Sequence, residues 1–286
     1  MAGDDVGVAV AAGLDGAPLA GVVDVNKAEA LRVAVGPFEI VEQRPGEVAG
    51  DRGARTDGLG TGVEVLLQVG DAVEVIDGAI SGDVVRRQLI EPTLGADGKP
   101  VFKSSIGCPF KKGTPTDCDN WSVSKPVITS ADSFNQWYRD TPGVNIAFEK
   151  TLELVDSGGG LYKYNSTSFF PLGNDQGFGI TPPGQSHNFL FTTEVHVTFE
   201  YVKGQTFSFQ GDDDMWIFVN GRLALDLGSM HSSEPGEIKF DDQAANLGIV
   251  VGRAYPMDIF HAERHTSASN FGVETNIACF TPAIVR

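Results

Sequence analysis

The feature that most constrains the fold is a hairpin signal near residue 220. Asn220-Gly221 separates the apolar run "MWIFV" (215–219) from the run "RLALDL" (222–227). Asn and Gly tolerate the positive φ angles that a two-residue turn between antiparallel strands requires. The sequence therefore predicts two antiparallel strands that are joined at this turn.

The chain around this hairpin also has the pattern of short strands. Segment 187–211 is predicted to form two strands about a turn at "KGQ", with Val195, Val197 and Phe199 on one face and Glu194 and His196 on the other. Further strands are predicted within 145–156, 161–172, 252–265 and 271–280. Segment 130–143 is the one predicted helix, capped by Ser130 and ended by Pro142. We therefore expect residues 91–286 to form an all-β domain, an antiparallel β-sandwich or barrel with one short helix.

Residues 1–90 differ from the rest of the chain in composition. They contain one aromatic residue, Phe38, and are rich in Val, Ala, Gly and Asp. Turn signals within 63–80 indicate short strands, but so few large side chains would make only a thin core. We predict a separate Gly/Val/Asp-rich region, either a small β module or a partly ordered lead-in, without an assignable role.

The net charge limits the kinds of molecule that the protein is expected to bind. A formal charge of −17 and a pI of about 4.6 argue against binding to nucleic acid or to an anionic membrane surface. No apolar run approaches the roughly 20 residues of a membrane span, so no membrane insertion is expected. The charge is typical of a secreted or surface protein or a binder of divalent cations, although solubility alone explains it equally well. The start "MAGDDVGVAV" has no basic region, so an export signal is not visible.

The three cysteines are Cys108, Cys118 and Cys279. Cys108 and Cys118 bracket a loop rich in Pro, Gly and Thr, and a disulfide between them would suit an oxidising compartment. A Cys118–Cys279 pair is equally allowed, and the sequence does not choose between them.

Three consecutive aspartates, Asp212, Asp213 and Asp214, precede the apolar strand. Adjacent carboxylates repel by roughly 4 kcal/mol per pair near a surface, so the triplet is either a solvated turn or a site for positive charge. Extended backbone sends neighbouring side chains to opposite faces. Two of these carboxylates would reach one hard cation only through an unusual, cis peptide.

The stretch "FHAERH" (260–265) places His261, Glu263 and His265 on one face of a strand. The order is not that of an HExxH protease, so we expect a hydrogen-bonded surface network with Phe260 facing the core. Arg264 is expected to pair with a nearby acid, for which Glu263 and Glu274 are the candidates. The chain has neither a nucleophile elbow nor a phosphate-binding loop, and we expect it not to be an enzyme.

Four ordered motifs resemble the fibro-slime domain family. They are "SADSFNQWYRDTPGVNI" (130–146), "HNFLFTTEVHVTF" (187–199), "GDDDMWIFVNGRLALDLGSMH" (211–231) and "GRAYPMDIFHAERHTSASNFGVETNI" (252–277), within a similarity that spans about 93–280. This family is similar to the β-sandwich lectin domain that was first named from anthrax protective antigen and that also occurs in adhesins.

The resemblance implies an extracellular β-sandwich in which two adjacent aspartates, joined by a cis peptide, hold one Ca²⁺ that binds sugar hydroxyls. Asp212 and Asp213 match the aspartate pair, and Asn270 in the loop "HAERHTSASNF" matches the amide ligand. The remaining residues expected to surround the ligand are Asp214, the hairpin-tip residues Asn220 and Arg222, His231, Arg264 and His265.

These expectations define one leading function and two alternatives. The leading one is a calcium-dependent carbohydrate-binding or adhesion module of a secreted or cell-surface protein, with glycans or a surface polysaccharide as partner. The first alternative is a structural matrix protein that uses Ca²⁺ for stability. The second is an accessory domain of a carbohydrate-active enzyme. The oligomeric state is not indicated.

Overall fold

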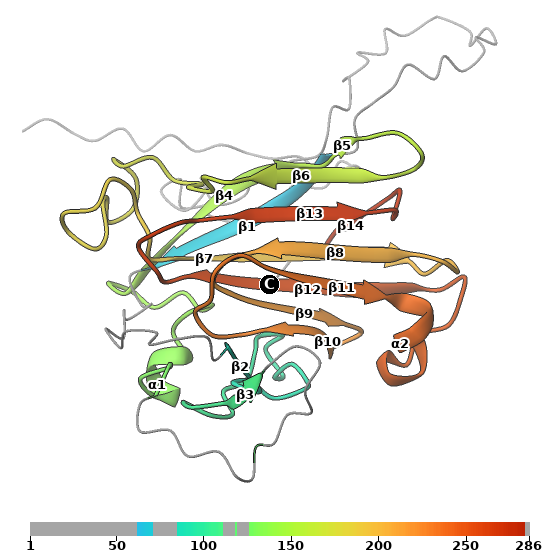
Figure 1. Cartoon of the computed structure of the whole chain (residues 1–286), viewed down its shortest axis with the longest axis horizontal. Helices are drawn as coiled ribbons and strands as arrows, with labels where there is room; N and C mark the ends of the chain where they lie inside the picture. Colours follow the sequence, from blue (N-terminus) through green and yellow to red (C-terminus); the bar gives the residue numbers. More distant parts are fainter. Residues whose placement is uncertain (1–61, 71–84, 111–117, 119–125, 284–286) are drawn as a thin grey trace, which may run out of the picture. The chain divides into compact units, whose positions relative to one another are not determined.

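The protein contains two antiparallel five-stranded sheets that face each other (Figure 1). The computed structural model describes the backbone of residues 62–70 and all atoms of residues 85–110, 118 and 126–283, which lie within one compact unit, Gly53–Arg286. The first sheet has the order β10-β9-β12-β7-β14 and the second sheet the order β11-β8-β13-β6-β5. The strands are β5 (Val155–Asp156), β6 (Tyr162–Ser166), β7 (Phe191–Glu200), β8 (Thr206–Gly211), β9 (Asp214–Val219), β10 (Arg222–Leu227), β11 (Glu234–Lys239), β12 (Ala254–Glu263), β13 (Phe271–Thr275) and β14 (Thr281–Pro282). The predicted all-β antiparallel sandwich is therefore confirmed.

The predicted hairpin is also confirmed. β9 and β10 pair antiparallel with Val219 opposite Arg222, and the turn residues Asn220 and Gly221 have φ angles of 53° and 70°. These positive φ values are the reason that Asn-Gly joins the strands with so short a turn.

The main core lies between the two sheets. Val195, Val197 and Phe199 of β7 face Phe207 and Phe209 of β8, and all five are buried. The alternation in the sequence thus identified the inward face of β7 correctly. It did not identify what covers the other face of the first sheet.

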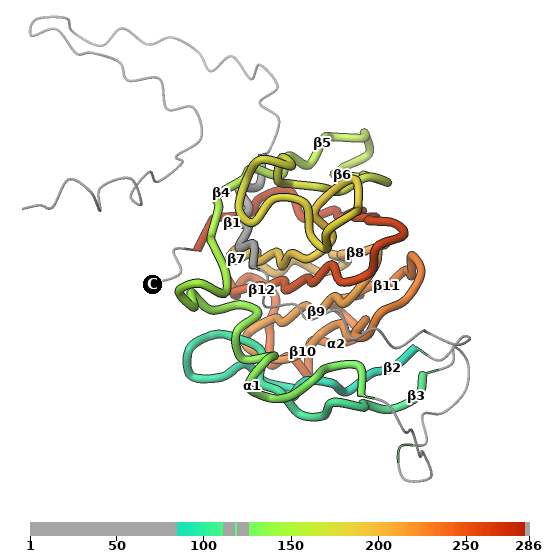
Figure 2. The backbone as a smooth tube through the Cα atoms, turned by 90° about the vertical axis from the view of Figure 1, so that its left-hand side faces the viewer, coloured from blue at the N-terminus to red at the C-terminus, as the bar shows by residue number. Residues whose placement is uncertain are grey.

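A second core lies on that other face. The described residues of 85–144 (85–110, 118 and 126–144), which we call the covering segment, include β2 (Val85–Arg87), β3 (Cys108–Phe110) and α1 (Ala131–Phe134). Its buried side chains, among them Phe134 and Trp137, pack against Trp216, Phe218 and Phe260 of the first sheet. Figure 2 shows α1, β2 and β3 on the side of β9 and β10 that lies away from the second sheet. A strand that is covered on both faces needs apolar residues at every position, which explains the continuous run in β9.

The described residues form two helices, α1 and a later one, and both are short. Ser130 caps α1 as predicted, since its Oγ accepts a hydrogen bond from the Ser133 N–H at 3.0 Å, but α1 ends at Phe134 rather than near Pro142. The expectation of a single helix is wrong, because α2 (Phe240–Leu247) follows β11. Gly248 ends α2 in a left-handed conformation, with φ of 69°.

Two strands from the first 90 residues pair with strands from the rest of the chain. β1 (Gly62–Gly70) pairs with β4 (Asn145–Glu153), and β2 pairs with β3. The remainder of residues 1–84, including most of the strands predicted in 63–80, lies outside the described residues. The proposed boundary at residue 90 therefore stays a prediction.

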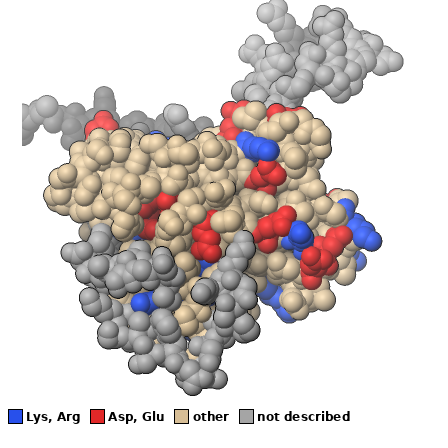
Figure 3. Space-filling model, viewed as in Figure 1, with Lys and Arg blue, Asp and Glu red and all other residues tan. Residues whose placement is uncertain are grey.

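The outer face of the second sheet is polar. Ser208 and Gln210 of β8, Glu274 of β13 and Lys163 of β6 occupy its outward positions, and Lys163 forms an ion pair with Glu274. Figure 3 shows this face, on which acidic side chains lie among many uncharged ones. Within the described part of the chain, no helix is sufficiently long and apolar to span a membrane.

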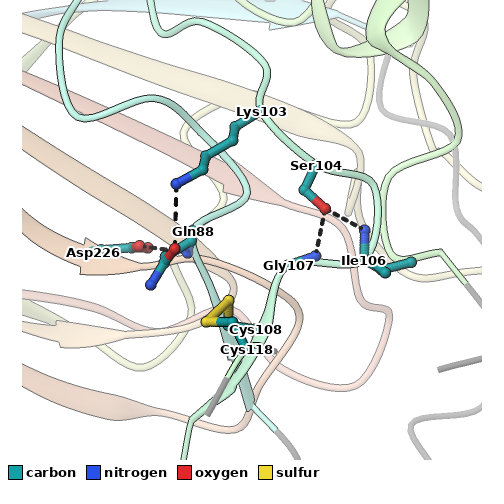
Figure 4. The surroundings of a disulfide bond; sticks show 8 residues. All are labelled: Gln88, Lys103, Ser104, Ile106, Gly107, Cys108, Cys118 and Asp226. Atoms are coloured by element: carbon teal, nitrogen blue, oxygen red, sulfur yellow. Dashed lines mark hydrogen bonds between the residues drawn. A yellow bond between two sulfur atoms is a disulfide. The ribbon is translucent and has the colours of Figure 1, made fainter. Parts of the chain in front are cut away.

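A disulfide joins Cys108 to Cys118, with the two Cα atoms 5.0 Å apart (Figure 4). This pairing decides between the two alternatives that the sequence left open, and Cys279 is free and exposed. Nearby, the Gln88 N–H donates to Asp226 of β10 at 2.8 Å, which ties the start of the covering segment to the first sheet.

Candidate functional site

The candidate site is a pocket at one end of the sandwich, where the chain passes from the second sheet to the first. Asp212 and Asp213 form this link between β8 and β9, and the peptide bond between them is cis. Phe271 at the start of β13 lies opposite Gly211 at the end of β8 and opposite Ser166 at the end of β6. The register of the second sheet therefore aligns these three strand ends beside the pocket. A cavity of about 280 Å³ opens here and is lined by Asp212, Asp213, His231, Ser232, Ser233, His265, Ser267, Ala268 and Asn270.

Asp212 is held by the loop that precedes β13. Its Oδ2 accepts a hydrogen bond from the side-chain amide of Asn270 at 2.6 Å, and its Oδ1 accepts one from the Asn270 backbone N–H. The Asp212 backbone N–H in turn donates to the Asn270 carbonyl at 3.2 Å. These reciprocal bonds bring together the aspartate and the asparagine that the sequence analysis placed in one site.

Asp213 is almost fully buried, with 1% of its surface exposed. Its two carboxylate oxygens accept hydrogen bonds from the backbone N–H groups of His231, at 3.2 Å, and Arg264, at 3.0 Å. Burial raises the pKa of Asp213 to about 7, because the Arg264 charge and the two amide donors offset only part of the desolvation cost, to which the Asp214 charge adds. This carboxylate would therefore gain from a cation in the pocket.

Asp214 does not line the pocket, although the sequence analysis placed it among the ligand-binding residues. Its side chain has no exposure and forms an ion pair with Arg264, whose Nε donates to Oδ2 at 2.5 Å and whose Nη2 donates to Oδ1 at 3.0 Å. The Ser229 N–H donates to the same carboxylate. The third aspartate is thus neutralised by Arg264 inside the protein, away from Asp212 and Asp213.

Arg264 itself is fully buried. Besides Asp214, its Nη1 donates to the Val127 carbonyl of the covering segment at 2.6 Å, and its guanidinium carbon lies 5.1 Å from the centre of the Trp137 ring. Its side chain therefore faces the covering segment, and Arg264 acts on the pocket only through Asp213, by its backbone N–H and by its nearby charge.

His261 and Glu263 are also fully buried, so the surface network expected for them is wrong. His261 faces the core between the sheets, where its ring lies 5.3 Å from the Phe271 ring, and its Nε2 donates to the Asp212 carbonyl at 3.0 Å. Burial lowers the pKa of His261 to about 4 and keeps the imidazole neutral. The hydrogen bond from His261 thus holds the Asp212 backbone in place from the side of the core.

Glu263 lies beneath Asp213 in the same interior. Its Oε1 accepts a hydrogen bond from the His265 N–H at 3.1 Å. Burial raises the pKa of Glu263 well above its usual range, and the negative charge of Asp213 adds to the effect.

The two remaining histidines of the predicted set lie at the pocket. The ring nitrogens of His231 lie 2.9 Å from the Ser232 carbonyl and 3.0 Å from the Leu227 carbonyl, which fixes the ring on the pocket wall. His265 is exposed, and its Nδ1 lies 2.8 Å from the Ser267 hydroxyl. The structure thus brings His231 and His265 together with the aspartate pair and Asn270.

Asn220 and Arg222 lie elsewhere, which corrects the expectation that the hairpin tip shapes the rim of the pocket. β9 separates them from Asp213 by six residues, which is roughly 20 Å of extended chain. The Asn220 amide donates to the Leu247 carbonyl and Arg222 donates to the Asn246 carbonyl, so both residues cap the end of α2.

Gly211 is a residue of the site that the sequence analysis did not single out. A Cβ atom at this position would lie closer than 3.0 Å to the Asn270 carbonyl oxygen and to the Phe209 ring. Glycine therefore lets the Asn270 loop approach the start of the aspartate link. The signal in the sequence was the glycine directly before three aspartates.

The residues present fit a calcium ion better than a transition metal. Among the described residues, no three His, Cys, Asp or Glu side chains are grouped so that they could hold a metal ion. Calcium takes its ligands from oxygens alone, those of carboxylates, carbonyls and waters. Carboxylate oxygens come from Asp212 and Asp213, and an amide oxygen comes from Asn270 once its side-chain amide is rotated by half a turn. Hydroxyl groups on the lining come from Ser232, Ser233 and Ser267.

The comparison with protein families covers the part of the sandwich that carries the pocket. Residues 200–280, which contain the aspartate link and the Asn270 loop, match the PA14 domain, a β-sandwich domain of carbohydrate-binding type that is typical of extracellular proteins.

The chain is also similar to several proteins of Dictyostelium discoideum. It is 35% identical to protein psiD over 194 residues, which cover 66% of this chain and 36% of psiD. It is 36% identical to protein psiQ over 204 residues (67% of this chain and 20% of psiQ) and 33% identical to protein psiR over 216 residues (71% and 20%). The chain thus spans between a fifth and about a third of these relatives.

Proposed function

We propose that the sandwich is a calcium-dependent carbohydrate-binding module of an extracellular or cell-surface adhesion protein. The observation that carries the proposal is the convergence of the neighbouring Asp212 and Asp213 side chains on one pocket, beside the Asn270 amide. Extended backbone would send these two carboxylates to opposite faces. The match of residues 200–280 to the PA14 domain, in general a carbohydrate-binding or adhesion module, supports the same function.

The chemistry of the pocket suits this role. Calcium takes 6–8 oxygen ligands, so Asp212, Asp213 and Asn270 would leave positions on the ion open. When bound, the ion supplies a Lewis acid to which neighbouring sugar hydroxyls add as further ligands. The serine hydroxyls and His265 on the rim would then donate and accept hydrogen bonds with the rest of the sugar ring.

Isothermal titration calorimetry with CaCl₂ tests the ion site. We expect the wild-type protein to bind Ca²⁺ and the Asp212→Ala/Asp213→Ala variant to lose this binding. The matched control is Glu200→Ala/Asp242→Ala, which removes two exposed carboxylates and so the same net charge, and which should bind as the wild type does. Absence of Ca²⁺ binding by the wild-type protein would overturn the proposal.

A glycan array in millimolar CaCl₂, repeated in EDTA, tests the ligand class. We expect retention on at least one group of glycans with calcium and none with EDTA. Retention that is unchanged by EDTA would contradict the role of the ion.

A second candidate function is a purely structural calcium site. Asp213 adjoins the first sheet and Asn270 adjoins β13 of the second, so an ion held by both would link the two sheets. On this alternative, chelation lowers the melting temperature while the glycan array stays blank.

A further inference from the structure

A second groove lies beside the candidate site, between β4 and the end of β6. It has a volume of about 210 Å³, the space of roughly seven water molecules, and is lined by residues 150–152 of β4, by Tyr164 and by residues 168–171. The sequence analysis assigned no role to any of these residues.

The groove and the aspartate pocket lie on the two sides of one loop. Phe271 at the start of β13 has Ser166 on one side and Gly211 on the other, so Ser166 and Gly211 are about two strand spacings, roughly 10 Å, apart. The groove continues from Ser166 and the pocket continues from Gly211. The loop that ends at Asn270 separates them.

Hydrogen bonds join the walls of the two cavities. The Phe169 N–H donates to the Ser269 carbonyl at 2.9 Å, and the Ser269 hydroxyl donates to the Phe169 carbonyl at 2.7 Å. Ser269 lies between Ala268 and Asn270, which both line the aspartate pocket. The distance between the two cavities is therefore fixed by the fold.

The lining of the groove is amphipathic. Tyr164 and Phe170, which are both half-buried, contribute aromatic rings, and Phe170 is held in place by stacking on His187 with the ring centres 4.1 Å apart. Thr151, Ser168 and Lys150 contribute hydroxyl and ammonium groups; Thr151 and Ser168 are exposed, and the Lys150 ammonium donates to Gln176 at 3.2 Å. A pyranose ring offers a matching surface, with an apolar C–H face and a rim of hydroxyls.

We propose that this groove is a second sugar subsite, which binds a further ring of the oligosaccharide whose first ring is held at Asp212 and Asp213. The inference rests on the proposed function and makes it more specific, because the ligand class becomes an oligosaccharide rather than a single terminal sugar. The loop 268–270 lies between the two rings and contacts both.

The test uses a variant that fills the groove from an exposed position. Ser168→Trp places a large side chain in the groove without removing a core residue. The matched control is Ser157→Trp, the same substitution at an exposed position in the turn between β5 and β6. Affinities are measured by calorimetry in millimolar CaCl₂ for monosaccharides and for oligosaccharides of the same sugars, chosen from the glycans retained on the array.

In the wild type and the control, we expect an oligosaccharide to bind about tenfold more tightly than its monosaccharide. A factor of about ten is the gain in affinity that one additional contact between rings provides. Ser168→Trp should abolish this difference and leave the affinities for the monosaccharide and Ca²⁺ unchanged. Equal affinities in the wild type, or an oligosaccharide preference that Ser168→Trp retains, would overturn the subsite alone. If the wild type binds no glycan at all, both the proposed function and the subsite are refuted.

Discussion

Arg264 and Asp214 form a two-pronged ion pair that has no exposure to solvent, with Nε–Oδ2 and Nη2–Oδ1 distances of 2.5 Å and 3.0 Å. The pair lies where three parts of the fold meet. Asp214 begins β9, Arg264 follows β12, and the Arg264 guanidinium contacts the covering segment at Val127 and Trp137. The pair therefore ties the covering segment to the strand that carries the candidate site.

Replacing one partner of this pair should destabilise the protein strongly. Arg264→Met leaves the Asp214 carboxylate buried without a counter-charge, which costs about 3–5 kcal/mol of unfolding free energy. Urea denaturation followed by tryptophan fluorescence measures the change. Arg264→Lys should restore only part of it, because an ammonium group cannot bind both carboxylate oxygens in the same plane.

The control for this prediction is the double variant Asp214→Leu/Arg264→Met. With both charges removed, it should be more stable than Arg264→Met alone, since no uncompensated charge remains. A double variant that is less stable than the single one would contradict the prediction, because it would show that the unpaired Asp214 carboxylate stabilises the fold through other contacts, such as the hydrogen bond from the Ser229 N–H.

Much of the sandwich was predictable from local patterns. Asn220-Gly221 marked the hairpin, and the alternation in β7 identified its inward face, because both signals depend only on neighbouring residues. The second core was not predictable in this way. Nothing local indicates that the covering segment folds over Trp216 and Phe260. Phe260, which faces that segment, was therefore assigned to the main core, and His261 and Glu263, which face the core between the sheets, were placed on the surface. α2 was missed because its eight residues have only two buried side chains, Phe240 and Leu247.

The candidate site was also predictable only where a short sequence motif identifies its residues. Asp212, Asp213 and Asn270 came from motifs, and the structure places them together. Asn220 and Arg222 were assigned by closeness in sequence, but a six-residue strand carries them to the far end of the sheet. The support from His261 depends on the register between β12 and β9, in which it lies opposite Met215, and no single segment contains that information.

Gly211→Ala should disturb both stability and the site. The added methyl group would overlap the Asn270 carbonyl and the Phe209 ring, and such overpacking costs about 1–3 kcal/mol. Because relief of the overlap moves the Asn270 loop away from Asp212, we also expect weaker Ca²⁺ binding in calorimetry. Gln210→Ala, at the exposed neighbouring position, is the matched control and should change neither. Wild-type stability in Gly211→Ala would contradict the close approach.

Removal of the disulfide should destabilise the protein through the unfolded state. Cys108 and Cys118 are separated by 10 residues in sequence, and a loop of this length contributes about 3 kcal/mol by restricting the unfolded chain. We expect Cys108→Ser/Cys118→Ser to lower the melting temperature in calorimetry, and the wild type to fall to the same value in reducing agent. Cys279→Ser, which changes the free and exposed cysteine, should have no effect.

His196 lies in a buried charged cluster that connects the covering segment to the first sheet. Its Nε2 lies 3.1 Å from Glu194 and its Nδ1 lies 2.7 Å from Asp258, while the Lys99 ammonium from the covering segment binds Glu194 at 2.5 Å. Burial lowers the pKa of His196, but the hydrogen bonds and charges of Asp258 and Glu194 outweigh it and raise the pKa above its usual value of 6.5.

We predict that the contribution of this cluster to the stability of the fold falls as the pH rises. A histidine whose pKa is higher in the folded than in the unfolded protein stabilises the fold fully below about pH 6.5, and this contribution is lost as the pH passes the folded-state pKa. We expect the melting temperature of the wild type minus that of His196→Gln to be largest near pH 6 and to shrink toward pH 9. In Asp258→Asn, which removes one of the two acceptors, the pH dependence should be smaller. A difference that is constant across this range, or that grows with pH, would show that His196 is neutral in the folded protein.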